Sequence, residues 1–292
     1  MPSSTPPCIV YLNGRFIRKD ESFISTDDRG FYFADGVYEV IKYYKGHPFC
    51  FEDHMIRLRN SLTSVRIEFD ISLLGSFCDQ LIEDNFLKND YAGVYVQITR
   101  GVAPRIHCFP GKEVKPTIFI RAFTMPSYLE DLRNGIRVIT REDIRWLRCD
   151  VKSIALLPNT MLFQQAVEQN AGECFLVRSG NYTEATHSNI MAVMGETVFT
   201  HPDSNLILPG ITKKILIRLC AELGIPLIER PVASKETSLF NECFITGTGS
   251  EVMPVVEIDG EPVGNGKPGP VTMRLQEEFF RRTYGRNILV KN

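Results

Sequence analysis

The segment Arg145-Trp146-Leu147-Arg148-Cys149-Asp150-Val151-Lys152-Ser153 lies near the middle of a chain of 292 residues and contains its only tryptophan. Lys152 follows Val151 and precedes the apolar run 154–157. Burial of an ammonium group is costly and lowers the pKa of a lysine, and such an amine can form a Schiff base with a carbonyl compound. The segment therefore marks Lys152 as a candidate nucleophile. The alternative is a surface lysine at the end of a strand.

The composition is that of a globular protein with a sizeable core. Hydrophobic residues make up 43% and charged residues 23% of the chain, and the length suggests one large or two medium domains. The net charge of −2 gives no electrostatic reason to expect nucleic-acid binding. Residues 1–7 lack the basic and apolar regions of a secretion signal and are expected to be a frayed tail. No apolar run reaches membrane-spanning length, so a cytoplasmic protein is expected.

The eight cysteines are scattered and form no C-x-x-C pair, and the five histidines show no metal-ligand spacing. We therefore expect no metal site. Most of these cysteines lie in apolar patterns, where a free thiol behaves as a small hydrophobic group. This use of cysteine fits a reducing compartment.

In the first part of the chain, turn residues and hydrophobic periodicity predict two β-hairpins followed by two helices and two strands. Asn-Gly at 13–14 and Lys-Gly at 45–46 supply the turns. The periodicity predicts hairpin strands at 9–12, 15–17, 40–44 and 47–51, helices at 52–63 and 71–87, and strands at 91–100 and 117–123. The dense loop 27–39 between the hairpins is typical of a site-forming segment.

A linker is expected to start at Thr124-Met125-Pro126-Ser127. The expected division is a small N-terminal domain at 1–123, a linker at 124–132 and a larger domain at 133–292. The larger domain is expected to contain strands at 135–140, 173–177, 189–193, 197–200 and 242–246, and helices at 159–169 with Asn159 as N-cap, 208–223 and 271–284. Helices and strands mix without a regular βαβ rhythm, so the fold class is predicted as α+β.

Two segments after the linker resemble anion sites. Pro209-Gly210-Ile211-Thr212 opens a predicted helix, where free N–H groups attract phosphate, and Gly247-Thr248-Gly249-Ser250 follows a strand as a turn rich in N–H groups and hydroxyls. The alternatives are an ordinary helix entry and a tight turn. Neither segment matches the P-loop, and no G-x-G-x-x-G opens a helix. A small phosphorylated cofactor is therefore a better expectation than a nucleotide.

Glu184 lies in the hydroxyl-rich segment 182–189, which is expected to be a turn before a strand. A buried carboxylate needs a cationic partner. The protonated ring nitrogen of pyridoxal phosphate is such a partner, and this cofactor also carries a phosphate. Together, an amine, a carboxylate and two phosphate-type turns are the parts that pyridoxal phosphate requires.

Six motifs, in order over nearly the whole chain, resemble the class IV (fold type IV) pyridoxal-phosphate aminotransferases. They are Gly36-Val37-Tyr38-Glu39, His54-Met55-Ile56-Arg57-Leu58, Asp150-Val151-Lys152-Ser153, Thr183-Glu184-x-x-x-Ser188-Asn189, Leu208-Pro209-Gly210-Ile211-Thr212 and Gly247-Thr248-Gly249-Ser250-Glu251. The resemblance implies a two-domain α+β fold with a smaller N-terminal α/β domain and a larger, barrel-like, cofactor-binding C-terminal domain of mixed strands.

The resemblance also implies roles for individual residues. Lys152 would form the Schiff base with the cofactor and shuttle the α-proton, and Glu184 would pair with the ring nitrogen. Leu208 would pack on the ring face. The remaining residues expected at the cofactor are Arg57, Ile211, Thr212 and Thr248 for the phosphate, together with Ser188 and Asn189.

Within the family, segments 103–107 and 143–150 most resemble D-amino-acid (D-alanine) aminotransferases. Tyr38, Arg105 and His107 resemble the family's site for the substrate α-carboxylate. In that site the last two residues come from the neighbouring subunit, so the resemblance implies a homodimer. The implied reaction is ping-pong transamination between a D-amino acid and a 2-oxo acid such as 2-oxoglutarate or pyruvate.

Two positions depart from the family pattern. His187 stands where the D-amino-acid enzymes tend to have a small hydroxyl residue, and Gly247 replaces a hydroxyl residue in the second turn. His187 either alters the pocket or points away from the cofactor, and the second is expected because the Ser188-Asn189 pair is kept. The alternatives are a branched-chain L-amino-acid or (R)-amine transaminase, an aminodeoxychorismate lyase, or a dimeric binding protein that has lost catalysis. The presence of both Lys152 and Glu184 argues against the last of these.

Overall fold

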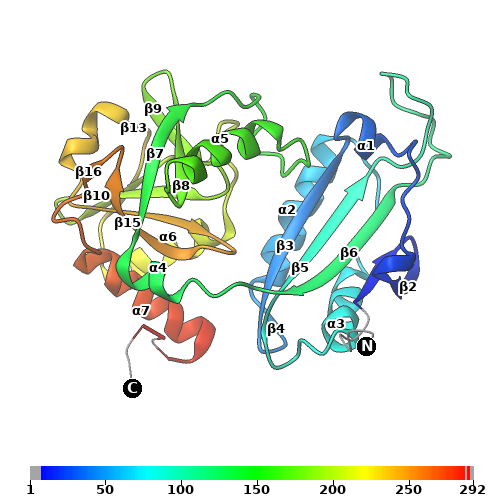
Figure 1. Ribbon diagram of the computed structural model, residues 1–292, viewed down its shortest axis with the longest axis horizontal. Helices are drawn as coiled ribbons and strands as arrows, with labels where there is room; N and C mark the ends of the chain where they lie inside the picture. Colours follow the sequence, from blue (N-terminus) through cyan, green and yellow to red (C-terminus); the bar gives the residue numbers. More distant parts are fainter. Residues whose placement is uncertain (1–7, 287, 290–292) are drawn as a thin grey trace. The chain divides into compact units, whose positions relative to one another are not determined.

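The computed structural model describes residues 8–286 and 288–289, and the expected tail at 1–7 lies outside these residues (Figure 1). The chain forms two compact units. The N-terminal unit comprises Met1–Pro126 and Val151–Ala155, and the C-terminal unit comprises Ser127–Asp150 and Leu156–Asn292. The short segment that carries Lys152 therefore packs with the N-terminal unit, whereas the expected division assigns it to the C-terminal domain. The boundary at 123/124 stays a prediction.

The N-terminal unit is an antiparallel sheet with helices packed on it. The strand order is β2-β1-β6-β5-β3-β4. The strands are β1 (Ile9–Leu12), β2 (Arg15–Arg18), β3 (Gly36–Tyr44), β4 (His47–Pro48), β5 (Tyr91–Thr99) and β6 (Thr117–Thr124). The helices are the short 3₁₀ segment η1 (Lys19–Glu21), α1 (Arg29–Phe33), α2 (Phe51–Ser64) and α3 (Leu74–Asp84). The predicted helix at 71–87 is thus shorter, and the loop predicted at 27–39 contains α1 and the start of β3.

Both predicted hairpins are confirmed, and the turns explain them. Asn13 and Gly14 have φ of 47° and 91°, and Lys45 and Gly46 have φ of 48° and 80°. Two successive residues with positive φ match the right-handed twist of the strands that they join. The second hairpin is shorter than predicted, because α2 already begins at Phe51.

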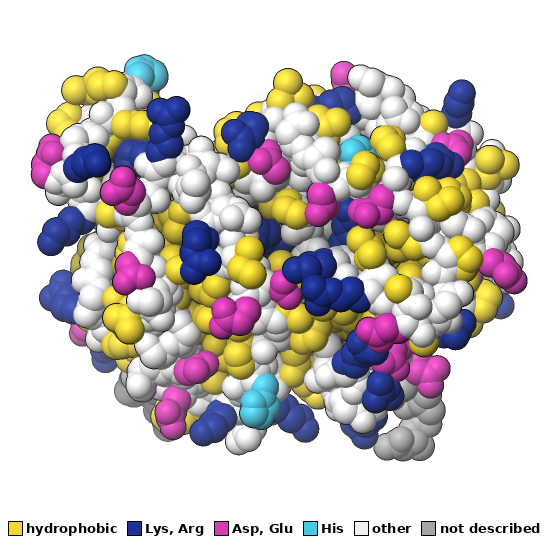
Figure 2. Space-filling view, turned by 180° about the vertical axis from the view of Figure 1, so that it is seen from behind, with side chains coloured by type: hydrophobic (Ala, Val, Ile, Leu, Met, Phe, Trp, Pro, Cys, Tyr) yellow, Lys and Arg dark blue, Asp and Glu magenta, His cyan; other side chains and the backbone are white. Residues whose placement is uncertain are grey.

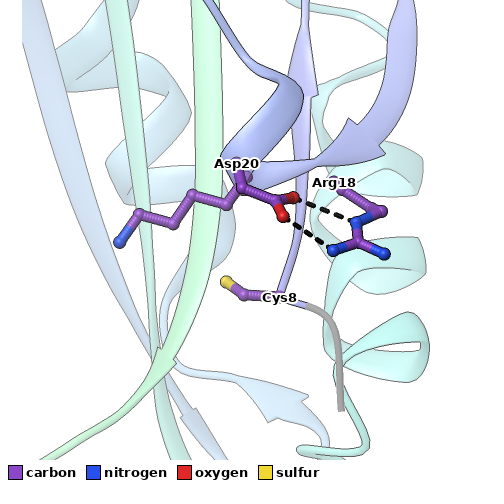
Figure 3. A pocket seen from close by; sticks show the side chains of 4 residues that line it. Cys8, Arg18 and Asp20 are labelled. Carbon is purple, nitrogen blue, oxygen red and sulfur yellow. Dashed lines mark hydrogen bonds and ion pairs between the residues drawn. The ribbon is translucent and has the colours of Figure 1, made fainter. Parts of the chain in front are cut away.

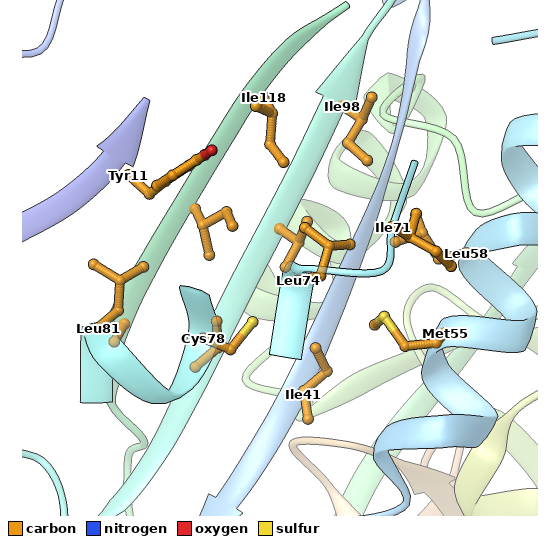
Figure 4. Close-up of a cluster of buried hydrophobic side chains, with 14 of the residues drawn as sticks. Tyr11, Ile41, Met55, Leu58, Ile71, Leu74, Cys78, Leu81, Ile98 and Ile118 are labelled. Carbon is orange, nitrogen blue, oxygen red and sulfur yellow. The ribbon is translucent and has the colours of Figure 1, made fainter. Parts of the chain in front are cut away.

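Apolar side chains of α2 and α3 form a single core with the sheet (Figure 4). Met55, Leu58 and Leu62 recur at helical spacing on α2 and are buried. They join Ile41 of β3 and Leu74 of α3 in one cluster. This core fixes α2 against β3, and α2 carries Arg57.

The C-terminal unit contains a mixed sheet of ten strands. Its order is β12-β11-β10-β14-β15-β7-β8-β9-β13, with β16 paired to β15. The strand β7 is parallel to both β8 and β15, and β11 is parallel to β12. The strands are β7 (Ile136–Glu142), β8 (Glu173–Arg178), β9 (Asn181–Ala185), β10 (Asn189–Met194), β11 (Thr197–Thr200), β12 (Leu227–Glu229), β13 (Val232–Ala233), β14 (Glu242–Gly247), β15 (Glu251–Ile258) and β16 (Glu261–Pro262). The helices are α4 (Leu129–Asn134), α5 (Leu157–Glu168), α6 (Ile211–Leu223), the 3₁₀ segment η2 (Ser234–Leu239) and α7 (Pro270–Tyr284).

Two expectations for this part of the chain are wrong, and one central strand was not expected. Asn159 is not an N-cap, because α5 begins at Leu157 and the Asn159 side chain donates to the Thr186 carbonyl at 2.6 Å. Glu184 lies on β9 rather than in a turn. No local pattern predicted β15, which pairs with β14 in the centre of the sheet.

In the part of the chain that the structure describes, no helix is long and apolar enough to cross a membrane. Positive and negative side chains are both scattered over the face seen in Figure 2.

Glu242 provides a test of how the helices are attached to the larger sheet. Its buried carboxylate on β14 accepts hydrogen bonds from the α7 backbone N–H groups of Val271 (2.9 Å) and Thr272 (2.7 Å) and from the Thr272 hydroxyl (2.7 Å). We expect Glu242→Ala to lower the free energy of unfolding by about 2–4 kcal/mol, because buried donors lose their acceptor. Urea unfolding measures this change. The exposed Glu261→Ala is the control and should change it by less than about 0.5 kcal/mol; equal effects would contradict the capping role.

Candidate active site

Backbone hydrogen bonds join the Lys152 segment to the start of β3. The Tyr38 N–H donates to the Lys152 carbonyl at 3.0 Å, and the Ile154 N–H donates to the Gly36 carbonyl at 3.1 Å. Gly36 is required for this approach of the two chains, because a Cβ there would lie 2.7 Å from the Ile98 carbonyl oxygen and 3.1 Å from the Ile154 side chain. Lys152 is therefore held as if it were part of an added strand.

The Lys152 side chain extends over an aromatic ring. Its Nζ lies 4.3 Å from the centre of the Tyr38 ring, a distance at which an ammonium group is attracted to the ring face. The Lys152 N–H also donates to Ser61 Oγ of α2 at 3.2 Å. The amine is half-buried in the N-terminal unit, in contact with one of the residues expected at the substrate.

Glu39, the next residue on β3, fixes Arg57. Its Oε1 accepts from Arg57 Nε at 2.8 Å and its Oε2 from Nη2 at 2.9 Å, and Oε2 also lies 2.8 Å from His54 Nδ1. Burial alone would raise the pKa of Glu39, but the charge and hydrogen bonds of Arg57, followed by those of His54, hold it well below its usual range. Burial lowers the pKa of His54. The carboxylate is thus ionised at neutral pH, and the Arg57 guanidinium is held in one plane.

Arg105 and His107 lie on the loop after β5, next to α1. The Arg105 guanidinium carbon lies 5.4 Å from the centre of the Phe33 ring, and the His107 ring centre also lies 5.4 Å from it. Both residues are exposed. The structure therefore brings these two predicted residues together on one aromatic support.

In the C-terminal unit, Glu184 is the buried centre of a second polar cluster. Its Oε2 accepts from Asn189 Nδ2 and from the Leu208 backbone N–H, both at 3.0 Å. Asn189 Nδ2 also donates to the Leu208 carbonyl at 3.0 Å. The predicted residues Glu184, Asn189 and Leu208 are thus brought together by direct hydrogen bonds.

Arg145 is a member of this cluster that the sequence did not mark as a site residue. Its Nη1 donates to Glu184 Oε1, while Nε and Nη2 donate to the two oxygens of Asp143 at 2.9 and 3.0 Å. Thr183 Oγ1 also donates to Asp143, at 3.0 Å. Because a buried Glu184 needs a cationic partner, the sequence indicated that such a partner exists. No local sequence pattern identified it as Arg145, which lies 39 residues away in the chain.

Burial is the largest influence on the protonation of this pair. It raises the pKa of Glu184 to about 6, although the charge and hydrogen bonds of Arg145 act in the opposite direction. Burial would lower the pKa of Arg145, but the Asp143 hydrogen bond and the charges of Glu184 and Asp143 raise it above its usual value. With these two pKa values, Glu184 is negatively charged and Arg145 positively charged at neutral pH. Glu184 is thus a carboxylate that takes up a proton at about pH 6, higher than an ordinary glutamate does.

The first predicted anion site is a helix N-terminus, as expected. The helix α6 begins at Ile211, and its N-cap Gly210 contributes no side-chain cap. A Cβ at Gly210 would lie 1.9 Å from Asn189 Oδ1, so only glycine allows this turn to approach the residue that orients Glu184. The buried Ile211 and Thr212 therefore present free N–H groups beside the Glu184 cluster.

The second predicted anion site is the turn between β14 and β15, which contains Thr248. Ser250 Oγ lies 3.3 Å from Ser188 Oγ, and a Cβ at Gly247 would lie 2.8 Å from Ser250 Oγ. Gly247 thus leaves room for two neighbouring hydroxyls, although it supplies none. This geometry gives a physical reason for the departure at Gly247.

His187 is fixed by its own contacts. Its Nδ1 lies 3.0 Å from Oε2 of the buried Glu173 and 3.0 Å from Thr186 Oγ1, and its ring packs edge-on against Phe163 of α5. More than half of the side chain, 56%, is exposed. The role of His187 toward a cofactor stays a prediction.

The chemistry of these groups fits pyridoxal phosphate. The N-terminal unit offers an amine and a fixed guanidinium, from Lys152 and Arg57. The C-terminal unit offers a buried carboxylate able to hold a proton and two turns suited to a phosphate. Within residues 8–286 and 288–289, no group of three or more His, Cys, Asp or Glu residues is arranged to hold a metal ion.

Comparison with known proteins gives consistent matches. The family model for amino-transferase class IV matches residues 36–258. The chain is 42% identical over 272 residues to the D-alanine aminotransferase of Staphylococcus haemolyticus, covering 92% of this chain and 96% of the relative. It is 40% identical to that of Bacillus licheniformis, covering 91% and 94%.

Solved structures of similar fold include branched-chain amino acid aminotransferases. The match to the Escherichia coli enzyme has a TM-score of 0.87 and 26% sequence identity, and it covers 98% of this chain and 97% of the E. coli chain. The enzyme from T.th., solved with pyridoxamine 5'-phosphate, has a TM-score of 0.86 and 25% identity, with coverage of 96% and 95%. These matches confirm the predicted two-domain α+β architecture.

The raised pKa of Glu184 predicts a pH-dependent stability of the cofactor-free protein. The folded protein holds a proton on Glu184 up to about pH 6, and a glutamate in the unfolded chain loses it near its ordinary value of 4.5. The stability that this proton provides is therefore present below pH 4.5 and is lost as the pH rises through 6, by up to about 2 kcal/mol. We expect the free energy of unfolding of the wild type, relative to Glu184→Gln, to fall by this amount between about pH 4 and 7. A difference that does not change with pH would contradict the raised pKa.

Proposed function

Because the chain belongs to the class IV aminotransferases, we propose that it transfers amino groups between a D-amino acid of the D-alanine type and a 2-oxo acid, with pyridoxal phosphate as cofactor. The observation that carries the proposal is the buried Glu184, held by three donors and able to bind a proton near pH 6. A carboxylate of this kind is suited to a protonated ring nitrogen.

When bound, pyridoxal phosphate supplies a carbonyl carbon that takes up the amino group and a ring that withdraws electrons. Lys152 would provide the amine that attaches the cofactor and would then move the proton of the substrate α-carbon. Glu184 would hold a proton at the ring nitrogen, and Leu208 would contact the ring. The residues that would bind the phosphate are Arg57, Thr248 and, through their N–H groups, Ile211 and Thr212, with Ser188 and Asn189 as further residues expected at the cofactor.

Tyr38, Arg105 and His107 bind the substrate α-carboxylate. The guanidinium of Arg105 suits a carboxylate because its N–H groups form a planar fork. Since the first amino acid leaves as a 2-oxo acid before the second 2-oxo acid binds, the kinetics are ping-pong. Pyruvate and 2-oxoglutarate are the expected acceptors.

The substrate assignment follows from the relatives. Identity to the D-alanine aminotransferases is 42% and 40%, against 26% and 25% for the branched-chain enzymes of similar structure. The branched-chain enzymes support the alternative, a transaminase of L-amino acids. The residues of segment 103–107 favour the first assignment.

We further infer a homodimer in the cytoplasm. Three large apolar side chains on α1 and the 101–110 loop are more than half exposed: Phe31, Ile106 and Phe109. Exposed apolar groups gathered in one region favour contact with another protein surface. All eight cysteines are free, which suits a reducing compartment.

The cofactor and the substrate are tested together by absorption. We expect the purified protein to acquire a visible absorption band with pyridoxal phosphate and to lose it on addition of D-alanine but not of L-leucine. Lys152→Ala should not acquire the band, because it lacks the amine. A band that L-leucine alone removes would overturn the substrate, and a band that persists in Lys152→Ala would overturn the attachment site.

The carboxylate site is tested by Arg105→Ala. We expect KM for D-alanine to rise at least about 30-fold, because one charge-assisted pair of hydrogen bonds is lost, while the visible band stays unchanged. Steady-state kinetics measure this effect. Arg105→Lys keeps the charge but not the planar fork of N–H groups, so its KM for D-alanine should lie between those of the wild type and Arg105→Ala. Loss of the visible band in Arg105→Ala would show instead that Arg105 supports the fold.

A further inference from the structure

One carboxylate, Asp35, is shared by two buried arginines just before β3. Its Oδ2 accepts from Arg29 Nε and from Arg100 Nε, both at 2.8 Å, and its Oδ1 accepts from Arg100 Nη2 at 2.9 Å. The three side chains are only 11%, 4% and 9% exposed, in the order Asp35, Arg29, Arg100. Pairing in such a site is strong, because little water competes for the charges.

Both arginines also hold the loop that follows β5. Arg29 Nη1 donates to the Ile106 carbonyl at 2.6 Å, and the Arg29 backbone N–H donates to the Gly101 carbonyl at 3.0 Å. The Arg100 guanidinium carbon lies 3.6 Å from the centre of the Phe109 ring. The loop is thus fixed at its start, middle and end.

The hydrogen bond from Arg29 holds the loop at a residue between the two that we propose to bind the substrate carboxylate. Ile106, whose carbonyl Arg29 holds, separates Arg105 from His107 in the chain. Both of these side chains pack on Phe33, and the Arg29 guanidinium carbon lies 4.7 Å from the centre of the same ring. Arg29 therefore sets the position of the backbone and of the aromatic support of the carboxylate site.

Asp35 is what keeps Arg29 in this position. Arg100 has two further acceptors, the carbonyls of Arg66 at 2.9 Å and Val65 at 2.7 Å. Without the negative charge of Asp35, two guanidinium groups would remain buried beside each other and repel. Arg100 is anchored by the end of α2, so Arg29 is the one that would move, and the contact with Ile106 would be lost.

We propose that Asp35 is a positioning residue for the substrate carboxylate, acting through Arg29 on the loop that carries Arg105 and His107. The inference rests on the proposed function, in which those two residues bind that carboxylate. In this role Asp35 acts through its contacts with Arg29 and Arg100 and needs no contact with substrate or cofactor.

The test is Asp35→Asn, which keeps the size of the side chain and removes its charge. We expect KM for D-alanine to rise about tenfold with kcat changed by less than about threefold, and an unchanged affinity for pyridoxal phosphate. The control is Asp20→Asn at the exposed Arg18–Asp20 pair of the same unit, where the two side chains are 53% and 66% exposed (Figure 3). It should leave KM and kcat at the wild-type values.

A double-mutant cycle separates positioning from general support of the fold. If Asp35 acts through the carboxylate site, Asp35→Asn adds less than about twofold to KM once Arg105 is alanine. Independent, multiplying effects would overturn the proposal. Arg29→Lys keeps a positive charge for Asp35 but has one nitrogen in place of the Nε and Nη1 that bind Asp35 and the Ile106 carbonyl, so it should raise KM in the same direction even where Asp35→Asn fails to fold.

Different results separate the proposed carboxylate site from the positioning role of Asp35. An unchanged KM in Arg105→Ala would refute the proposed carboxylate site itself. A raised KM in Arg105→Ala together with wild-type KM in both Asp35→Asn and Arg29→Lys would refute only the positioning role of Asp35.

Discussion

The backbone hydrogen bonds between the Lys152 segment and β3 are the constraint on which the site depends. They place the amine on the sheet of the N-terminal unit, next to Tyr38, although the segment comes more than a hundred residues later in the chain. The strand β3 then carries Glu39 as well, which fixes Arg57. One strand thus determines the position of the Lys152 amine, of Tyr38, which we propose to bind the substrate, and of Arg57, which we propose to bind the phosphate.

Buried carboxylates paired with arginines recur throughout the protein. Each pair costs desolvation, so it contributes little net stability, but it restricts a long side chain to one geometry. Glu39 fixes Arg57, Arg145 fixes Glu184, and Asp35 fixes two arginines of the loop support. Chemistry that depends on placing a charge within a few tenths of an ångström gains from this restriction.

Local patterns in the sequence predicted most of the elements. The Asn-Gly and Lys-Gly turns predicted both hairpins, and helical spacing of apolar residues predicted α2, α6 and α7, because these signals act over a few residues. Glu184 was placed in a turn because its hydroxyl-rich neighbours are typical of loops, yet pairing with β8 makes the segment a strand. Asn159 resembles an N-cap but uses its amide to hold the Thr186 carbonyl.

The residues that support the site could not be found in this way. Arg145 meets Glu184 across 39 residues, and Arg100 meets Asp35 across 65. Partners at such separations are set by the sheet topology, which no local pattern specifies. Residue chemistry alone suggested Lys152, Glu184 and the two phosphate-type turns as parts of a cofactor site, whereas Arg57, Leu208 and the residues expected at the substrate were suggested only by the family resemblance.

The central claim is that Lys152 is the amine that binds the cofactor. Two other lysines, Lys42 and Lys213, are more deeply buried, and Lys213 is held by the His201 carbonyl and by Asp203. Borohydride reduction of the protein loaded with pyridoxal phosphate, followed by peptide mass spectrometry, identifies the lysine directly. We predict a pyridoxyl group on Lys152 alone. A label on Lys213 or Lys42 with Lys152 unmodified would contradict the account.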